Sequence, residues 1–289
     1  MLALAIVSGL CMGGMYGLLA LGFHITYAVS NTVNFAQGTS LMLGAVLCYL
    51  FSVTLHWPIG LAIAAALALC ALWGMLIERV AVRPFVRASS NGWLMATVAA
   101  GIILEQSVMF TFGKEPRSLV LPVSGEAFSL GGLAVSPLQV AILVVAIAVA
   151  LGLTAFAGRT RYGKALAAIV QNPQAAGLMG IDVTRAIVYC YAASTVLAGI
   201  AGILIAPLFA VSADMGTLFG VKAFAVAILG GLGSARGVVL AGFVFGVVEA
   251  LITSMLGSAY TNILAFFLVI VALAIRPHGL LGSAGVKKV

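Results

Sequence analysis

Long apolar runs separated by short polar breaks dominate the chain. Each run is close to the roughly 20 apolar residues that a helix needs to cross a bilayer. The pattern predicts an all-α polytopic membrane protein of about nine spans, within a range of eight to ten, forming a single transmembrane domain over residues 1–289. The runs cover residues 2–27, 35–54, 59–77, 93–112, 137–156, 186–208, 218–232, 238–256 and 260–275.

The seventh run, residues 218–232, is short for a span. It could be a full crossing, a half-helix or a re-entrant segment, and broken helices of this kind occur where backbone is buried in protein or lines a cavity. Small-residue spacings such as Gly9-x-x-x-Gly13 and Gly242-x-x-x-Gly246 allow helix backbones to approach closely. They predict a tightly packed bundle.

Composition supports the membrane interpretation. The chain is 63% hydrophobic and 7% charged, against about 25% charged residues in soluble domains. The four cysteines all lie inside apolar runs without C-x-x-C spacing, so we expect buried small side chains rather than disulfides or a metal site. The net charge of +7 does not indicate nucleic acid, because the basic residues stand singly at the ends of apolar runs.

The basic residues fall unevenly on the two sides of a nine-span topology. Lys114, Arg117 and Lys222 are on one side, and the other side carries the remaining eleven. By the positive-inside rule that side is cytoplasmic, so the N-terminus is expected outside and the C-terminus inside. The eleven are Arg79, Arg83, Arg87, Arg159, Arg161, Lys164, Arg185, Arg236, Arg276, Lys287 and Lys288.

One long break, residues 158–185, stands out on the cytoplasmic side. Asn172 is a favourable N-cap, and Pro173 suits the first helical position. Gly180 is typical of the left-handed residue that ends a helix. The sequence therefore predicts a short helix, Pro173 to Met179, on a basic loop. The loop could bind a partner, or it could be structural, with basic side chains that reach lipid headgroups.

Two other breaks, residues 30–40 and 229–237, are polar and glycine-rich. Paired breaks in hydrophobic segments are typical of a transporter pathway; the alternative is two ordinary short loops. The candidate pathway residues in these breaks are Asn34, Gln37, Gly38, Gly231 and Gly233.

Ionisable residues inside the spans add further candidates. Glu105 and Glu249 are expensive at membrane depth, so each is a candidate for the pathway or for a structural pair. Lys222, expected near the outer face, could attract a carboxylate or reach headgroups. The glycine-rich 230–237 segment lacks the Gly-Lys-Ser/Thr ending of a phosphate loop, so we do not expect ATP to bind this chain.

Five segments together resemble the branched-chain amino-acid ABC permease family, in particular its shorter H-type subunit. The resemblance runs from about Gly9 to Gly282. The segments are Asn34–Gly38, Gly101–Glu105, Arg161–Ala165, Gly180–Asp182 and Ala227–Ser234.

The resemblance implies a bacterial inner-membrane importer. Its partners would be a second, different permease subunit, two cytoplasmic ATPases that carry ATP and Mg²⁺, and a periplasmic or extracellular solute-binding protein. Gln174-Ala175-Ala176-x-x-x-Gly180 resembles the EAA-x3-G docking signature, with Gln in place of Glu and no downstream I-x-L-P. The residues that the resemblance implies for ATPase coupling are Arg161, Gly163, Lys164, Ala165, Asn172, Pro173, Gln174, Ala175, Ala176, Gly180 and Ile181.

Other function classes remain open at this point. An ion-coupled secondary transporter or channel would use Glu105 and Glu249 as coupling ligands and would need no docking loop. A membrane enzyme lacks a catalytic cluster of His, Cys or carboxylates. The solute cannot be read from the sequence, since the resemblance extends to permeases for urea, short amides and small acids.

Overall fold

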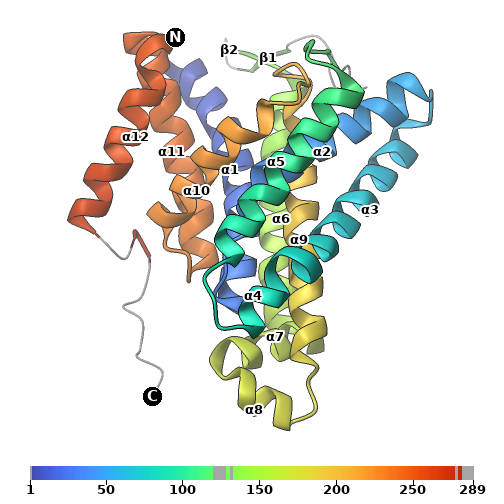
Figure 1. Ribbon diagram of the computed structural model, residues 1–289. Coiled ribbons are helices and arrows are strands. Elements are labelled where there is room, and N and C mark those ends of the chain that lie inside the picture. Colours follow the sequence, from blue (N-terminus) through green and yellow to red (C-terminus); the bar gives the residue numbers. More distant parts are fainter. Residues whose placement is uncertain (1, 120–127, 131–132, 277–278, 282–289) are drawn as a thin grey trace.

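The computed structural model describes residues 2–119, 128–130, 133–276 and 279–281. The fold is a bundle of helices with one antiparallel pair of short strands at one end (Figure 1). The elements are α1 (Leu2–Ser30), α2 (Gln37–Tyr49), a π-helical turn (Leu50–Thr54), α3 (Ile59–Ile77), a second π-helical turn (Glu78–Val82), α4 (Arg83–Arg87), α5 (Trp93–Phe112), β1 (Phe128–Leu130), β2 (Leu133–Val135), α6 (Pro137–Arg159), α7 (Arg161–Gln171), α8 (Pro173–Leu178), α9 (Val183–Ile205), α10 (Met215–Gly230), α11 (Ala235–Leu256) and α12 (Ser258–Ile275).

The predicted polytopic helical class is confirmed. Within the described residues, eight helical segments are long and apolar enough to span a membrane. The short seventh apolar run forms α10, whose 16 residues extend about 24 Å at 1.5 Å per residue. That is shorter than the roughly 30 Å hydrocarbon layer, so α10 on its own does not reach from one side to the other.

Helix α1 is the central element, and it packs against α6, α9, α10 and α11. Its contact with α11 runs through the glycines that the sequence singles out. A Cβ atom on Gly13 would lie 2.7 Å from the Cα of Phe243, and one on Gly242 would lie 2.8 Å from the Cα of Gly17. The two backbones therefore touch, as the small-residue spacing predicts.

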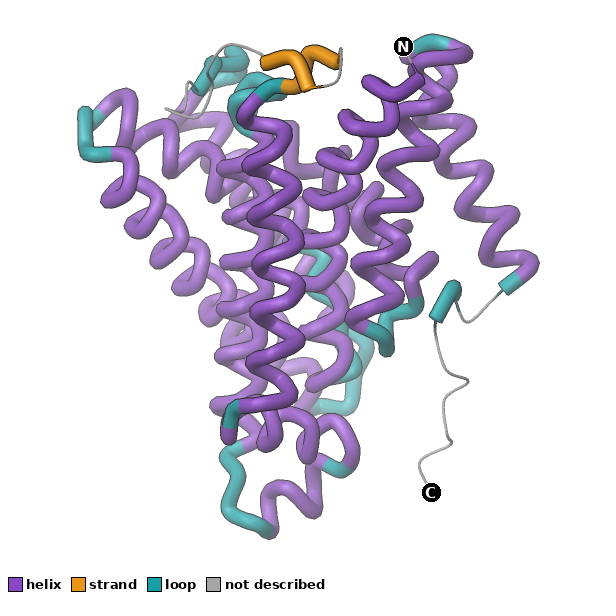
Figure 2. The backbone as a smooth tube through the Cα atoms, turned by 180° about the vertical axis from the view of Figure 1, so that it is seen from behind, coloured by secondary structure: helices purple, strands orange, loops and turns teal. Residues whose placement is uncertain are grey.

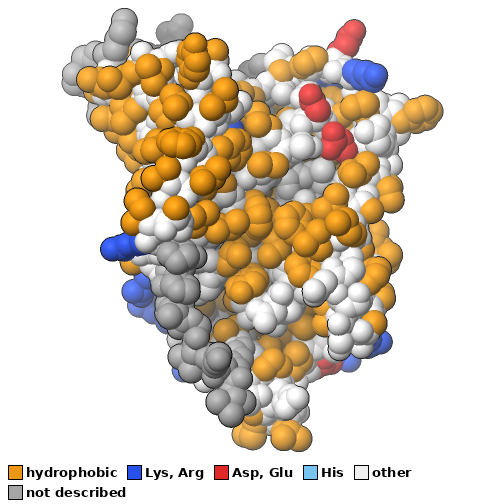
Figure 3. Space-filling view, turned by 60° about the vertical axis from the view of Figure 1, so that its left-hand side comes forward, with side chains coloured by type: hydrophobic (Ala, Val, Ile, Leu, Met, Phe, Trp, Pro, Cys, Tyr) orange, Lys and Arg blue, Asp and Glu red, His pale blue; other side chains and the backbone are white. Residues whose placement is uncertain are grey.

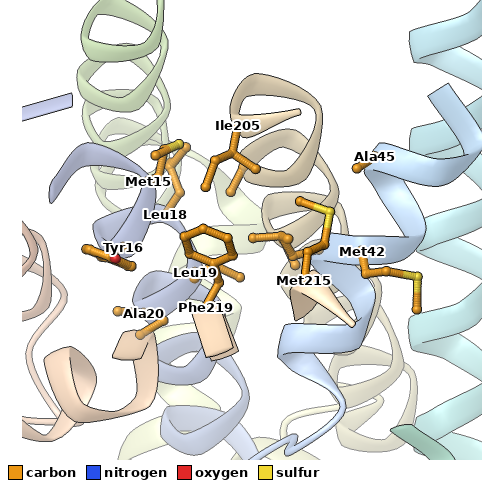
Figure 4. Packing of buried hydrophobic residues seen from close by; sticks show 14 of the residues in the cluster. Met15, Tyr16, Leu18, Leu19, Ala20, Met42, Ala45, Ile205, Met215 and Phe219 are labelled. Atoms are coloured by element: carbon orange, nitrogen blue, oxygen red, sulfur yellow. The ribbon is translucent and has the colours of Figure 1, made fainter. Parts of the chain in front are cut away.

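The buried core gathers around this contact. Tyr16 and Leu19 of α1 lie beside Phe219 of α10 (Figure 4). Met42 of α2 and Ile205 of α9 belong to the same cluster of buried residues. The outer helices are far less buried. Hydrophobic side chains cover most of the face shown in Figure 3, as expected for a surface that meets lipid or another membrane subunit.

Segments rich in basic residues gather at one end of the bundle. Helices α4, α7 and α8 lie at this end, whereas the N-terminus, the strand pair and the α11–α12 turn lie at the other (Figures 1 and 2). Two of the residues counted for orientation, Lys287 and Lys288, lie outside the described residues.

Filling the α1–α11 contact tests its importance. Because an added side chain at Gly242 meets backbone that cannot move aside, we expect Gly242→Val to destabilise the fold by about 1–3 kcal/mol. Thermal unfolding in detergent would measure the loss. Gly152→Val on α6 is the matched control, since nothing lies within 4 Å of a Cβ there. Equal stability of the two variants would contradict this account.

Candidate functional site

The first predicted break lies deep in the bundle, where side-chain hydrogen bonds hold it in place. Gln37 Nε2 donates to the carbonyl of Ser194 at 2.9 Å, and Ser194 Oγ lies 2.9 Å from both Gln37 Oε1 and the carbonyl of Gly22. Ser194 is the middle residue of α9, so α2 begins near half the depth of that helix. Gln37 is fully buried and joins α1, α2 and α9 rather than facing a cavity.

Asn34 shapes the turn that leads into α2. Its Oδ1 accepts a hydrogen bond from the Ala36 backbone N–H at 3.1 Å. Its Nδ2 is buried and has no hydrogen-bond partner among the described residues. The side chain therefore stabilises the non-helical backbone locally, and one buried donor remains unsatisfied, which is unusual in a packed interior.

Gly38 brings the start of α2 against the start of α10. A Cβ atom on Gly38 would lie 2.8 Å from the Cα of Gly220, so the two backbones touch here as well. Beside this contact lies a cleft of about 200 Å³. The starts of two short helices thus form one wall of a cavity inside the bundle.

The cleft combines an apolar wall with one carboxylate. Phe23, Phe35 and Phe224 contribute aromatic rings, and Phe224 lies 5.2–5.5 Å from the other two, between ring centroids. Glu105 of α5 also lines the cleft, and Thr217 Oγ1 donates to its Oε2 at 2.9 Å. Glu105 is half-buried, so its second oxygen can accept a donor from a bound solute.

The second predicted break lies elsewhere. Gly231, with φ of +88°, ends α10, and the following loop is anchored because His24 Nδ1 donates to the Leu232 carbonyl at 2.7 Å. Phe23 faces the cleft, whereas His24 lines a separate crevice together with Gly233. The two breaks therefore meet neighbouring residues of α1 without sharing one cavity.

Glu249 has a partner within the membrane. Lys222 Nζ donates to Glu249 Oε1, and the two residues are only 5% and 8% exposed. Lys222, expected to attract a carboxylate solute or to reach headgroups, instead turns inward from α10 to α11. Neither residue lines the cleft, so this pair joins two helices instead.

The short helix predicted within the 158–185 break is present as α8. Asn172 Oδ1 accepts from the backbone N–H groups of Gln174 and Ala175, both at 3.0 Å, and Pro173 is the first helical residue. Gly180 has φ of +84° and follows Met179, the C-cap. The helix ends at Leu178, one residue before the predicted end.

The structure adds a helix that the sequence prediction missed. Helix α7 covers Arg161–Gln171 and includes Arg161, Gly163, Lys164 and Ala165, which were expected in an irregular loop. Thr160 caps it by accepting from the Gly163 N–H at 3.0 Å. The signal was available, because apolar residues recur at helical spacing through Leu166, Ile169 and Val170.

Helix α8 lies at the far tip of the molecule (Figure 1), and apolar side chains are exposed at its end. Leu178 is 90% exposed and Met179 is 83% exposed, whereas Ala176 is buried. Gln174 and Ala175 are exposed on the same short helix, and Ile181 is half-buried where the chain returns to α9. Large apolar side chains so fully exposed at the end of a membrane bundle are typical of a protein-binding surface.

The structure thus brings Gly38 and Glu105 into one cleft and gathers the docking candidates on α7, α8 and the residues that follow. Gln37, Gly231, Gly233 and Glu249 lie outside the cleft. Thr217 and the three phenylalanines were missed, since nothing in the local sequence shows which side of a helix meets Glu105. Among the described residues there is no group of three or more His, Cys, Asp or Glu that could hold a metal ion.

These features define a polytopic membrane protein of the transporter class, with a small cleft between short helices and a short helix with exposed apolar side chains at one end. Residues 5–273 match the family described as "Branched-chain amino acid transport system / permease component". The chain belongs to this family and is a transmembrane permease component.

Individual relatives match over nearly the whole chain. The high-affinity branched-chain amino acid transport system permease protein BraD of Pseudomonas aeruginosa is 33% identical, over 98% of this chain and 97% of that protein. LivH of Escherichia coli strain K12, with the same description, is 30% identical over 98% and 96%. The solved structure of PsaBC from Streptococcus pneumoniae in complex with Fab matches with a TM-score of 0.51 and 14% identity, over 94% and 91% of the chains, which supports the fold.

The Lys222–Glu249 pair yields a stability prediction. Lys222→Met leaves a buried carboxylate without its cation, and breaking a buried pair in this way costs about 3–5 kcal/mol. Replacing both residues, as Lys222→Met with Glu249→Leu, removes the unpaired charge, so most of the stability should return. Thermal unfolding of the three proteins in detergent measures this. A single variant as stable as the wild type would show that the pair contributes nothing.

Proposed function

We propose that this chain is the permease subunit of an ATP-driven ABC importer for branched-chain amino acids or related small amphipathic solutes. The observation that carries the proposal is the cleft, where one carboxylate faces an aromatic wall. An amino acid with an aliphatic side chain has matching chemistry, because its ammonium group can donate to Glu105 while its side chain contacts Phe35 and Phe224. The descriptions of BraD and LivH as branched-chain amino acid permeases agree with this choice.

The size of the cleft suits a small solute. Its volume of about 200 Å³ is below the about 300–1,000 Å³ that is typical for drug-sized ligands. The cleft opens beside Ile102, Thr217 and Val221, and all three residues are exposed. In the proposed importer a second, homologous permease subunit covers this face, so that the pathway runs between the two subunits.

The proposed docking surface for two cytoplasmic ATPases is the tip formed by α7 and α8. Leu178 and Met179 supply apolar contact area, and Arg161 and Lys164 supply positive charge around it. Desolvated apolar anchors surrounded by polar residues are the usual source of affinity in a protein interface. ATP and Mg²⁺ then act on the ATPases, and this chain, one transmembrane domain of residues 1–289, does not hydrolyse ATP.

A line of contacts supports transmission from this tip to the cleft. Helix α8 leads directly into α9, whose Ser194 binds Gln37 at the start of α2. The next residue of α2, Gly38, lines the cleft. A displacement of α8 by closing ATPases would therefore reach the cleft through α9 and α2, which is the proposed switch between inward- and outward-facing states.

The proposed orientation follows the charge distribution. The N-terminus lies outside and the C-terminus in the cytoplasm, because the topology predicted from the sequence puts eleven of the fourteen basic residues on the same side as the 158–185 break. A solute-binding protein, periplasmic or extracellular, would deliver the solute to the opposite end in a bacterial inner or plasma membrane. An ion-coupled transporter is less well supported, since Glu249 is paired with Lys222 and leaves Glu105 as a lone coupling ligand.

Uptake by the reconstituted complex tests the substrate site. A charge-assisted hydrogen bond contributes about 1.5–3 kcal/mol, so Glu105→Gln should weaken the apparent affinity for leucine by roughly 10- to 100-fold. Thr217→Val, which removes only a neutral partner of that carboxylate, should have a smaller effect. Basal ATP hydrolysis should stay unchanged in both. Unaltered leucine uptake in Glu105→Gln would exclude the carboxylate from solute recognition.

Co-purification tests the docking surface. Leu178→Glu introduces a charge into the proposed apolar contact, where the loss of an anchor costs about 2 kcal/mol or more. We expect the amount of ATPase that co-purifies with the permease to fall by at least about tenfold. Val86→Glu, at an exposed apolar position on α4 at the same end, is the matched control. If both variants retain the ATPases equally well, α8 is not the helix that docks on them.

A further inference from the structure

A large crevice separates the second half of α6 from the rest of the bundle. The first half of α6 is held against α1, where Cys11 Sγ donates to the Gln139 carbonyl at 3.1 Å and Gln139 Nε2 donates to Ser8 Oγ at 3.3 Å. From Ala150 onward, α6 lines an open space of about 1450 Å³. Helix α6, which follows the strand pair, is at the front of Figure 2.

The walls of this crevice are apolar along the membrane-spanning part. Leu21 and Ile25 of α1, Leu153 of α6 and Leu240 of α11 line it, and Leu166 of α7 closes its end. A space of this size exceeds the about 300–1,000 Å³ of typical small-molecule pockets. An apolar space that is open on one side and bounded by membrane-spanning helices suits the acyl chains of a lipid.

Positive charge gathers at the α7 end of the crevice. Arg185 and Arg236 both line it, and Asp182 is its one acidic residue among those described. Asp182 already pairs with Arg185, with 3.0 Å between Oδ2 and Nε. Arg236 is exposed and has no hydrogen bond or ion pair with any described residue. One cation therefore remains unbalanced at the mouth of an apolar space.

The position of Arg236 strengthens this charge. It is the second residue of α11, where the positive end of the helix dipole disfavours a cation and favours an anion. An anion beside Arg236 would satisfy both the guanidinium and the helix end. Basic pockets between membrane helices are known to take acidic lipid headgroups.

We propose that this crevice binds an anionic phospholipid from the leaflet at the α7 end. The phosphate lies at Arg236, and the acyl chains run along α6 against α1 and α11. Such a lipid contacts α6, α7, α9 and α11 at once. It would therefore hold in place the helices that flank α8 in the chain, α7 and α9. The inference concerns binding of a lipid and is independent of which solute the permease carries.

The headgroup is tested by lipid retention in the purified full-length chain. The protein is extracted from membranes of phosphatidylglycerol and phosphatidylethanolamine in mild detergent, and the retained lipids are counted by mass spectrometry. Arg236→Gln should reduce retained phosphatidylglycerol by about fivefold, the effect of one basic side chain near an acidic headgroup. Arg87→Gln, at an exposed position on α4 outside the crevice, should leave it unchanged.

The acyl-chain part has its own pair of variants. Ala150→Trp fills the crevice from α6 and should reduce retention of both lipids, whereas Gly152→Trp on the same helix projects outside it and should not. The proposal is overturned if Arg236→Gln retains as much phosphatidylglycerol as the wild type, or if Arg87→Gln loses it equally. It is also overturned if α6 cross-links along the crevice to a second permease subunit. The headgroup comparison needs no substitution inside the bundle, so it stands even where Ala150→Trp does not fold.

Discussion

The direct contact between the backbones of α1 and α11 is the constraint on which the rest of the structure depends. Helices in lipid gain little from burying apolar surface against one another, because lipid tails are equally apolar. Close packing at Gly13 and Gly242 supplies the attraction instead. This contact fixes α1 at the centre, and α1 then presents Phe23 to the cleft and His24 to the crevice.

Buried polar groups set the angles and depths at which the other helices meet α1. Gln37 and Ser194 hold the start of α2 in the middle of the bundle, and Lys222 holds α10 to Glu249 of α11. In a medium without water each such group needs a partner from the protein. The starts of two short helices, α2 and α10, therefore meet inside the bundle, and the cleft lies beside their contact.

Helices α7 and α8 are connected to the cleft through α9 and α2. Helix α7 follows α6 after a cap at Thr160, and α8 precedes α9, whose middle residue binds the start of α2. Helix α9, which follows α8 in the chain, is thus hydrogen-bonded to Gln37, the residue next to Gly38 of the cleft.

The sequence alone determined the features that depend on local chemistry. Hydrophobic runs predict where spans lie, because burial in a bilayer requires about 20 apolar residues, and the Asn172-Pro173 and Gly180 signals predict α8 because caps are made by adjacent residues. Tertiary structure decided which side chains meet. The pairing of Lys222 with Glu249, and of Thr217 with Glu105, joins residues 27 and 112 positions apart. Such pairs depend on the rotation and depth of each helix, which are set by packing against neighbours and are absent from any local pattern.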